Sequence, residues 1–195
     1  MSLSHLLRYA LLTTLVFMGM PAIAQTNAQI WDTTASSTKH LFAVTNQNQR
    51  IQIGTVNFKP AGHNIIQFDV NLELDRFKDF FLSMKEFKCL EGDEVSCHVP
   101  YPYRNPRIIQ NGDLSWLEHS LLFLYKSPKD FGAKLWNGIY YHFEQENNRL
   151  IGRAQAIDLN DISAPPDSQE VAPYAAVTRP DYPAGTRWIT QLVIE

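Results

Sequence analysis

The chain has 195 residues, 45% of them hydrophobic, and its 20 acidic residues outnumber its 17 basic residues. This length suits a single globular domain with its own core. Because Lys and Arg are scattered and outnumbered, the composition argues against a nucleic-acid partner and against electrostatic attachment of the whole chain to an anionic membrane.

The first 24 residues have the pattern of a secretory signal peptide. Arg8 precedes an apolar run over residues 9–20, and Ala22 and Ala24 stand at −3 and −1 of a cleavage point before Gln25. The apolar run is shorter than the ~20 residues that a membrane-spanning helix needs. We therefore expect a periplasmic or secreted protein, cleaved between Ala24 and Gln25, with no stable membrane anchor afterwards.

Residues 25–39 are polar and rich in Ser and Thr. They predict a flexible N-terminal arm that Trp31 pins to the body of the protein. Residues 40–195 then form a single globular domain.

Three strands are predicted early in this domain, over residues 41–45, 50–58 and 65–74. The third strand alternates strictly between apolar and polar residues, which is typical of an antiparallel sheet with one buried and one solvated face. Its apolar residues are Ile66, Phe68, Val70, Leu72 and Leu74. In the second strand the apolar parity changes at Gly54, which predicts a β-bulge there.

Residues 75–89 fit both a helical stripe and an alternating strand. We favour a turn followed by a strand that runs into Cys89. Cys89 and Cys97 are the only cysteines, so export into an oxidising compartment predicts a disulfide between them. Closing so short a loop stabilises a fold by roughly 2–3 kcal/mol. The spacing suits neither a redox motif nor a zinc site, so we expect no metal and no cofactor.

The main amphipathic helix is predicted over residues 113–125. It would begin at Asp113 or at the capping-box pattern of Ser115 and Glu118, and it would end before Pro128. On its polar face Leu122 would stand exposed, which makes it a candidate for contact with a partner. The leucines of the apolar face are Leu114, Leu117, Leu121 and Leu124.

A hairpin is predicted from residues 138–146 and 149–158 around Asn147 and Asn148. A two-residue turn places each large side chain of the first strand opposite a small residue of the second. The predicted pairs are Phe143 with Gly152, Tyr141 with Ala154, and Ile139 with Ala156. On the other face Tyr140, His142 and Glu144 meet Gln155, Arg153 and Ile151.

Residues 163–185 are rich in proline and lack periodicity, so we expect an irregular crossing segment before a last strand over residues 187–194. The elements together predict an α+β fold. It would be a predominantly antiparallel β-sheet, curled or barrel-like, with one main amphipathic helix.

The candidate ligand site lies in the proline-rich stretch after the disulfide loop. Prolines hold this stretch extended, so Tyr101 and Tyr103 project from the same side. With Arg104 and Arg107 beside them, and His98 before them, they could stack on sugar rings or hold an anionic group. Alternatively, the tyrosines close the end of the sheet and the arginines pair with carboxylates.

Common hydrolase signatures and the P-loop are absent from the sequence. We therefore expect a soluble binding or accessory protein of the bacterial cell envelope rather than an enzyme. Its ligand would be a small molecule, a glycan or an envelope protein. The alternative is a small secreted or periplasmic hydrolase that uses carboxylate and histidine chemistry, such as His98 with Glu118.

Overall fold

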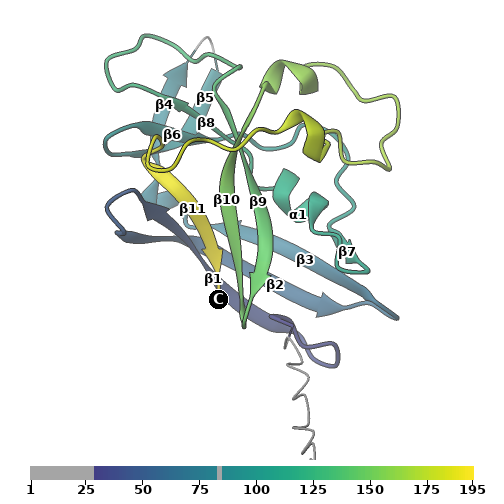
Figure 1. Ribbon diagram of the computed structural model, residues 1–195. Coiled ribbons are helices and arrows are strands. Elements are labelled where there is room, and N and C mark those ends of the chain that lie inside the picture. Colours follow the sequence, from purple (N-terminus) through teal and green to yellow (C-terminus); the bar gives the residue numbers. More distant parts are fainter. Residues whose placement is uncertain (1–28, 83–84) are drawn as a thin grey trace, which may run out of the picture.

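The computed structural model describes residues 29–82 and 85–195. The predicted signal peptide, its cleavage point and the first residues of the arm lie outside the described residues. Within the described part, eleven strands form one antiparallel sheet in the order β4-β5-β6-β8-β9-β10-β11-β1-β2-β3-β7. The sheet is bent, with β1, β2 and β3 crossing below the steep β9 and β10 (Figure 1). Because β4 and β7 do not pair, the sheet is open and not a closed barrel.

The first six strands are β1 (Ser37–Thr45), β2 (Arg50–Pro60), β3 (Ile65–Leu72), β4 (Lys78–Leu82), β5 (Lys85–Glu91) and β6 (Val95–His98). The others are β7 (Ile108–Gln110), β8 (Phe123–Lys126), β9 (Gly138–Glu146), β10 (Arg149–Ile157) and β11 (Ile189–Ile194). Helical structure is limited to α1 (Ser115–His119) and three short 3₁₀ turns in the described chain. The turns are η1 (Leu74–Arg76), η2 (Leu159–Ile162) and η3 (Ala176–Thr178). The fold is therefore essentially all-β, and the predicted α+β class is wrong on this point.

The long helix predicted over residues 113–125 is replaced by α1 and the strand β8. The reason is visible in the run from Leu121 to Leu124, where every side chain is buried. Leu121 and Phe123 enter one apolar cluster, whereas Leu122 and Leu124 enter a second. Side chains that alternate between two apolar clusters are typical of an extended chain covered on both faces. The spacing of the leucines also fits a helix, so the sequence pattern alone favoured the wrong element. Leu122 is fully buried rather than exposed, so its predicted position was wrong.

The predicted hairpin and its register are confirmed, with the second strand ending at Ile157 instead of residue 158. Strands β9 and β10 pair Phe143 with Gly152, Tyr141 with Ala154 and Ile139 with Ala156, and the polar face pairs as expected. The bulge is confirmed as well, since the β1–β2 register shifts between the pairs Leu41–Gly54 and Phe42–Gln52.

The disulfide between Cys89 and Cys97 is present and joins directly opposed residues of β5 and β6. The described residues 75–82 and 85–89 contribute a turn and the strands β4 and β5, so the favoured strand into Cys89 is correct. Trp31 packs against Phe58 with ring centroids 5.6 Å apart, while residues 37–39 of the predicted arm belong to β1.

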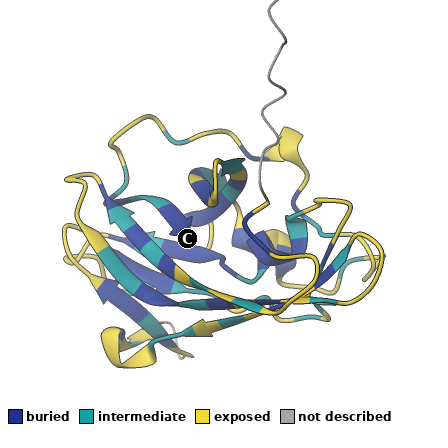
Figure 2. Cartoon of the chain, turned by 90° about the horizontal axis from the view of Figure 1, so that it is seen from below, coloured by how far each residue is buried: buried dark blue, intermediate teal, exposed yellow. Residues whose placement is uncertain are grey.

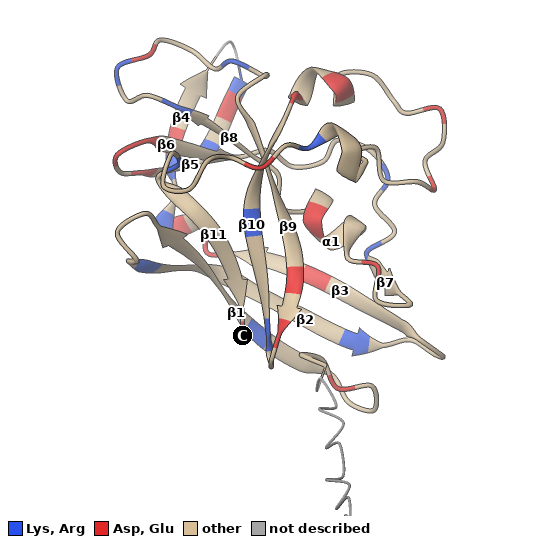
Figure 3. Ribbon diagram, viewed as in Figure 1, with Lys and Arg blue, Asp and Glu red and all other residues tan. Residues whose placement is uncertain are grey.

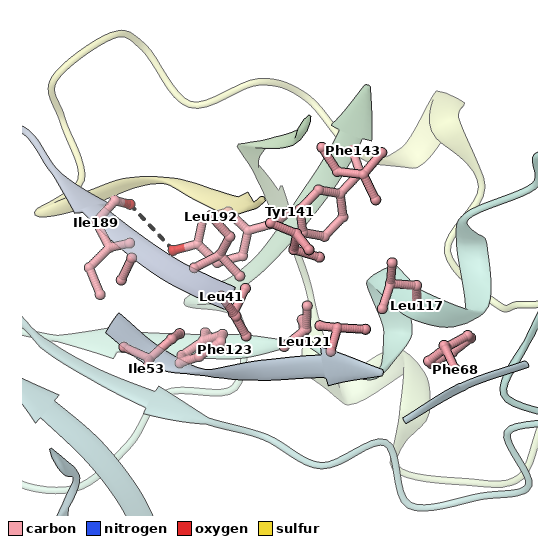
Figure 4. Close-up of a cluster of buried hydrophobic side chains, with 14 of the residues drawn as sticks. Leu41, Ile53, Phe68, Leu117, Leu121, Phe123, Tyr141, Phe143, Ile189 and Leu192 are labelled. Atoms are coloured by element: carbon pink, nitrogen blue, oxygen red, sulfur yellow. Dashed lines mark hydrogen bonds between the residues drawn. The ribbon is translucent and has the colours of Figure 1, made fainter. Parts of the chain in front are cut away.

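The main apolar cluster lies inside the bend of the sheet, where β1, β2, β3, β9 and β11 meet α1 and β8 (Figure 2). Leu117 and Leu121 approach Phe68 and Phe123 there, and the Tyr141 hydroxyl donates to the Ile189 carbonyl (Figure 4). The second cluster covers the opposite face of β5, β6 and β8. In the described residues no helix is both long and apolar enough to cross a membrane.

The first prediction concerns the close packing of Gly152 against Phe143. A Cβ atom at Gly152 would lie 2.8 Å from Cε1 of Phe143, which is closer than two carbon atoms can approach. We expect Gly152→Ala to lower the free energy of unfolding by about 1–3 kcal/mol, because the ring must move within a packed core. Urea denaturation measures this change. Gln67→Ala, at an exposed position of β3, should stay close to wild type, and equal stability of all three proteins would contradict the packing.

Candidate functional site

Four of the five predicted ligand residues line one pocket of about 610 Å³, which we call the Tyr101 pocket. Its walls include Phe68, Val70 and Leu72 of β3, Lys88 of β5, and His98, Tyr101, Tyr103, Asn105 and Arg107. Strand β3 lies next to one edge of the sheet, and β5 lies next to the other. The pocket therefore lies where the two ends of the bent sheet approach each other, with the extended segment 99–107 between them. Arg104 lines a separate, smaller pocket.

The two tyrosines of the pocket contact each other edge to face, with ring centroids 5.7 Å apart. The Tyr103 hydroxyl donates a hydrogen bond of 3.2 Å to the Ile162 carbonyl. Tyr101 packs against His119, and its buried hydroxyl has no hydrogen-bond partner among the described residues. Burial raises the pKa of Tyr101, and the neighbouring Tyr103 adds to this effect. Both rings thus help to close the end of the sheet.

Arg107 and Asn105 of this segment both form hydrogen bonds within the protein. Arg107 donates from Nη1 to Asp69 over 2.9 Å, and both side chains are exposed. Asn105 donates to the Trp116 carbonyl and to the Ser120 hydroxyl, at 2.9 and 3.0 Å, and accepts from the Arg107 backbone N–H. The segment is therefore tied to α1, and Arg107 pairs with a carboxylate as the alternative interpretation expects.

His98 does not pair with Glu118. Its Nε2 donates to the Ser120 carbonyl over 3.1 Å, and its ring lies against Phe123. Burial lowers the pKa of His98, although the hydrogen bond to the carbonyl opposes this effect, so the imidazole is neutral at pH 7. The catalytic pair suggested from the sequence is not formed.

Glu118 is instead the centre of a buried polar cluster. Its Oε1 accepts from the Phe143 backbone N–H at 2.7 Å and from Nδ1 of His142 at 2.9 Å. Its Oε2 accepts from the Tyr140 hydroxyl at 2.5 Å. The buried guanidinium of Arg179 lies 3.9 Å from the same oxygen, above the Tyr140 ring.

The geometry of the sheet explains why a carboxylate is buried at this point. Strands β8 and β9 pair only through Phe123 with Ile139 and Leu124 with Gly138. Beyond these pairs the chain before β8 folds into α1, which leaves the N–H of Phe143 without a strand partner. A buried N–H without an acceptor is costly, so the Glu118 carboxylate takes the place of the missing strand.

His119, the next residue of α1, belongs to the same cluster, because its ring contacts the Tyr140 ring edge to face at 5.3 Å. Its Nδ1 donates to the Ser115 carbonyl at 2.7 Å, and its Nε2 accepts from the Tyr174 backbone N–H at 3.3 Å. The ring stacks on Tyr174. Burial lowers the pKa of His119 to about 4, so the ring is neutral with its proton on Nδ1.

Sequence reasoning missed this cluster, although one signal pointed to it. Glu118 and His119 interrupt an otherwise apolar stretch, and such residues are rarely buried unless they are paired. Their partners could not be identified, because Arg179 comes from the irregular segment and His142 from a distant strand. The carboxylate oxygens are occupied by protein donors, which is the arrangement of a structural network. No group of three metal-ligating side chains could hold a metal ion within residues 29–82 and 85–195.

A further pocket of about 750 Å³ lies near the β2–β3 turn, with Trp31 in its wall. Among the described residues, no Asp, Glu, Lys or Arg lines it. Its polar residues are Gln29, Thr33, His63, Asn64 and Asn111.

Comparisons of the chain with protein-family models, with curated proteins and with solved structures found no match.

The second prediction tests the buried pair of Glu118 and Arg179. We expect Glu118→Gln to lower the free energy of unfolding by about 3–5 kcal/mol, because it leaves the Arg179 charge buried without its counter-ion. Arg179→Met should also destabilise, and the double variant should lose clearly less than the sum of the two changes. Urea denaturation of the four proteins gives the coupling energy. Additive losses would show that the two side chains do not interact.

The third prediction follows from the depressed pKa of His119. The unfolded chain binds a proton at this residue near pH 6.5, whereas the folded chain does so only near pH 4. The contribution of His119 to stability is therefore complete above about pH 6.5, and it is lost as the pH falls towards 4. We expect a loss of about 3 kcal/mol from this residue, measured by urea denaturation between pH 7 and pH 4.

The control variants separate His119 from other groups. His119→Gln retains a donor and an acceptor but cannot titrate. It should therefore reduce the number of protons taken up on unfolding between pH 4 and pH 6.5 by about one, and flatten the dependence of stability on pH accordingly. His98, whose pKa is also lowered, contributes in the same direction and remains in this variant. Gln67→Ala, at an exposed position that carries no titratable group, should leave the dependence as in wild type. An unchanged dependence in His119→Gln would exclude the assignment.

Proposed function

We propose that the chain is an exported, soluble binding or accessory protein of the bacterial cell envelope, and that the Tyr101 pocket holds its ligand. One observation carries this proposal. The segment chosen from the sequence for its aromatic and basic residues lines a pocket whose opposite wall is the apolar face of β3. Export rests on the signal-peptide pattern of the sequence and on the buried disulfide, which is typical of oxidising compartments.

The chemistry of the pocket favours a small molecule with an apolar body and an anionic group. Val70, Leu72 and Leu74 offer the apolar surface, while Lys88 and Arg107 bring cationic groups to the same pocket. Both cations pair with carboxylates of exposed or half-exposed residues. Such pairs contribute little to stability, so a ligand anion can replace Asp69 beside Arg107 at small cost.

A hydrolase remains the second candidate, because Glu118 hydrogen-bonds to His142, whose side chain is 43% exposed. This pair resembles a carboxylate that orients a general base. Binding is the stronger proposal because Glu118 also holds the Phe143 N–H and the Tyr140 hydroxyl. A bound compound that changes covalently during the binding experiment would favour the hydrolase.

The fourth prediction tests the pocket by charge reversal. Protein purified from its native envelope is examined by native mass spectrometry for a retained small molecule, and the identified compound is titrated by calorimetry. We expect Arg107→Glu to weaken binding at least tenfold, since a cation beside the ligand anion becomes an anion. Arg104→Glu makes the same change three residues away, outside the Tyr101 pocket, and should bind as wild type does. Equal affinity of all three proteins would refute the assignment of the pocket.

A further inference from the structure

The loop of residues 127–137, between β8 and β9, presents large apolar side chains to water. Phe131 is fully exposed, Trp136 is 63% exposed and Leu135 is 38% exposed. The loop projects beside the outer ends of β4 and β5 (Figure 1). Exposed aromatic side chains gathered on one projecting loop mark an interaction surface more often than a single exposed residue does.

An apolar groove of about 410 Å³ lies directly behind this loop. The loop contributes Ala133 and Leu135, and the groove continues over β4, β5 and η2, with Leu82, Phe87, Val99 and Ile162 in its walls. The Leu159 N–H donates to the Leu135 carbonyl over 2.9 Å, which fixes the loop against the groove. Loop and groove therefore form one continuous apolar surface, which we call the loop surface.

Charged groups on the loop surface are mainly cationic. Lys129 and Lys134 stand in the loop and Lys85 lines the groove, all three exposed. None of the three forms an ion pair within the part of the chain that the structure describes. Asp130 is the one acidic residue of the loop. The three lysines thus form a cationic rim, which is bordered by the carboxylates of Glu86 in β5 and Asp161 in η2, on a chain whose net charge is −3. Figure 3 shows both basic and acidic segments in this region.

We propose that the loop surface docks onto a bilayer that contains anionic phospholipids. Phe131, Leu135 and Trp136 enter the interfacial region, where aromatic side chains are favoured. The lysines of the rim lie at the level of the lipid phosphates. A narrow projecting loop suits insertion between lipid headgroups better than a broad protein contact, which needs about 800 Å² on each partner. This inference concerns where the protein acts and does not depend on the Tyr101 pocket.

The chain carries its own reporter for this docking. Trp31, Trp116 and Trp188 are buried, so Trp136 is the exposed one of the four tryptophans. The fluorescence that aqueous iodide quenches in the folded protein therefore comes from Trp136. Vesicles with phosphatidylglycerol should reduce this quenching and shift the emission to shorter wavelength, whereas pure phosphatidylcholine vesicles should do so more weakly. Trp136→Phe should lack the quenchable signal from the start.

Co-sedimentation with the same vesicles separates the apolar and electrostatic contributions. We expect Phe131→Ser with Leu135→Ser to reduce the partition coefficient at least about tenfold, because much of the inserted apolar area is removed. Lys129→Glu with Lys134→Glu should also reduce it at least about tenfold and weaken its dependence on salt. Val177→Ser changes a 91% exposed apolar residue of η3, outside the loop surface, and should partition as wild type does.

Three results would overturn the proposal. The first is unchanged iodide quenching in the presence of phosphatidylglycerol vesicles. The second is equal partitioning of wild type and the Phe131 and Leu135 double variant. The third is that the loop surface binds a protein partner in solution, whereas the protein does not bind to the vesicles. Circular dichroism of each variant confirms that these surface changes leave the fold intact.

Discussion

The carboxylate of Glu118 is the interaction on which the arrangement of this fold depends. It accepts the Phe143 N–H of β9, which lies beyond the part of β9 that pairs with β8. It also faces the buried charge of Arg179. One side chain therefore connects α1, the part of β9 that β8 does not pair, and the irregular C-terminal segment. Because Asn105 donates to Trp116 of the same helix and to Ser120 just after it, the wall of the Tyr101 pocket depends on the position of that helix. The fold and the candidate site thus both depend on α1, which a buried carboxylate holds in place.

The parts of the fold that were predictable are those set by neighbouring residues. The β9–β10 register follows from a two-residue turn and from the size of Phe143 against Gly152, both of which are local features. The bulge at Gly54 follows from the change of apolar parity in β2. The disulfide follows from the presence of only two cysteines in a chain that we expect to be exported. The helix over residues 113–125 was mispredicted because the run Leu121–Leu124 is apolar on every face. Whether such a run is a helix or a covered strand depends on what packs on both sides, which only the assembled sheet decides.

The candidate site was predictable in its residue types but not in its partners. Tyr101, Tyr103 and Arg107 do share a pocket, since prolines limit the conformations of a short segment. The wall of β3 opposite them comes from the other end of the sheet, and its proximity follows from the bend of eleven strands. The loop surface was missed because Phe131 and Trp136 lie between elements, where sequence patterns carry little information about exposure.

The first and last strands of the sheet lie side by side, with Leu41 opposite Ile194. The aromatic ring of Trp188, just before β11, also covers Gly92 in the turn between the disulfide-linked strands. A chain that appears residue by residue cannot complete this sheet until β11 has appeared, because β1 pairs with a strand about 150 residues later in the sequence. In the exported protein that we propose, this delay would keep the chain unfolded during translocation, so that it folds after it has crossed the membrane.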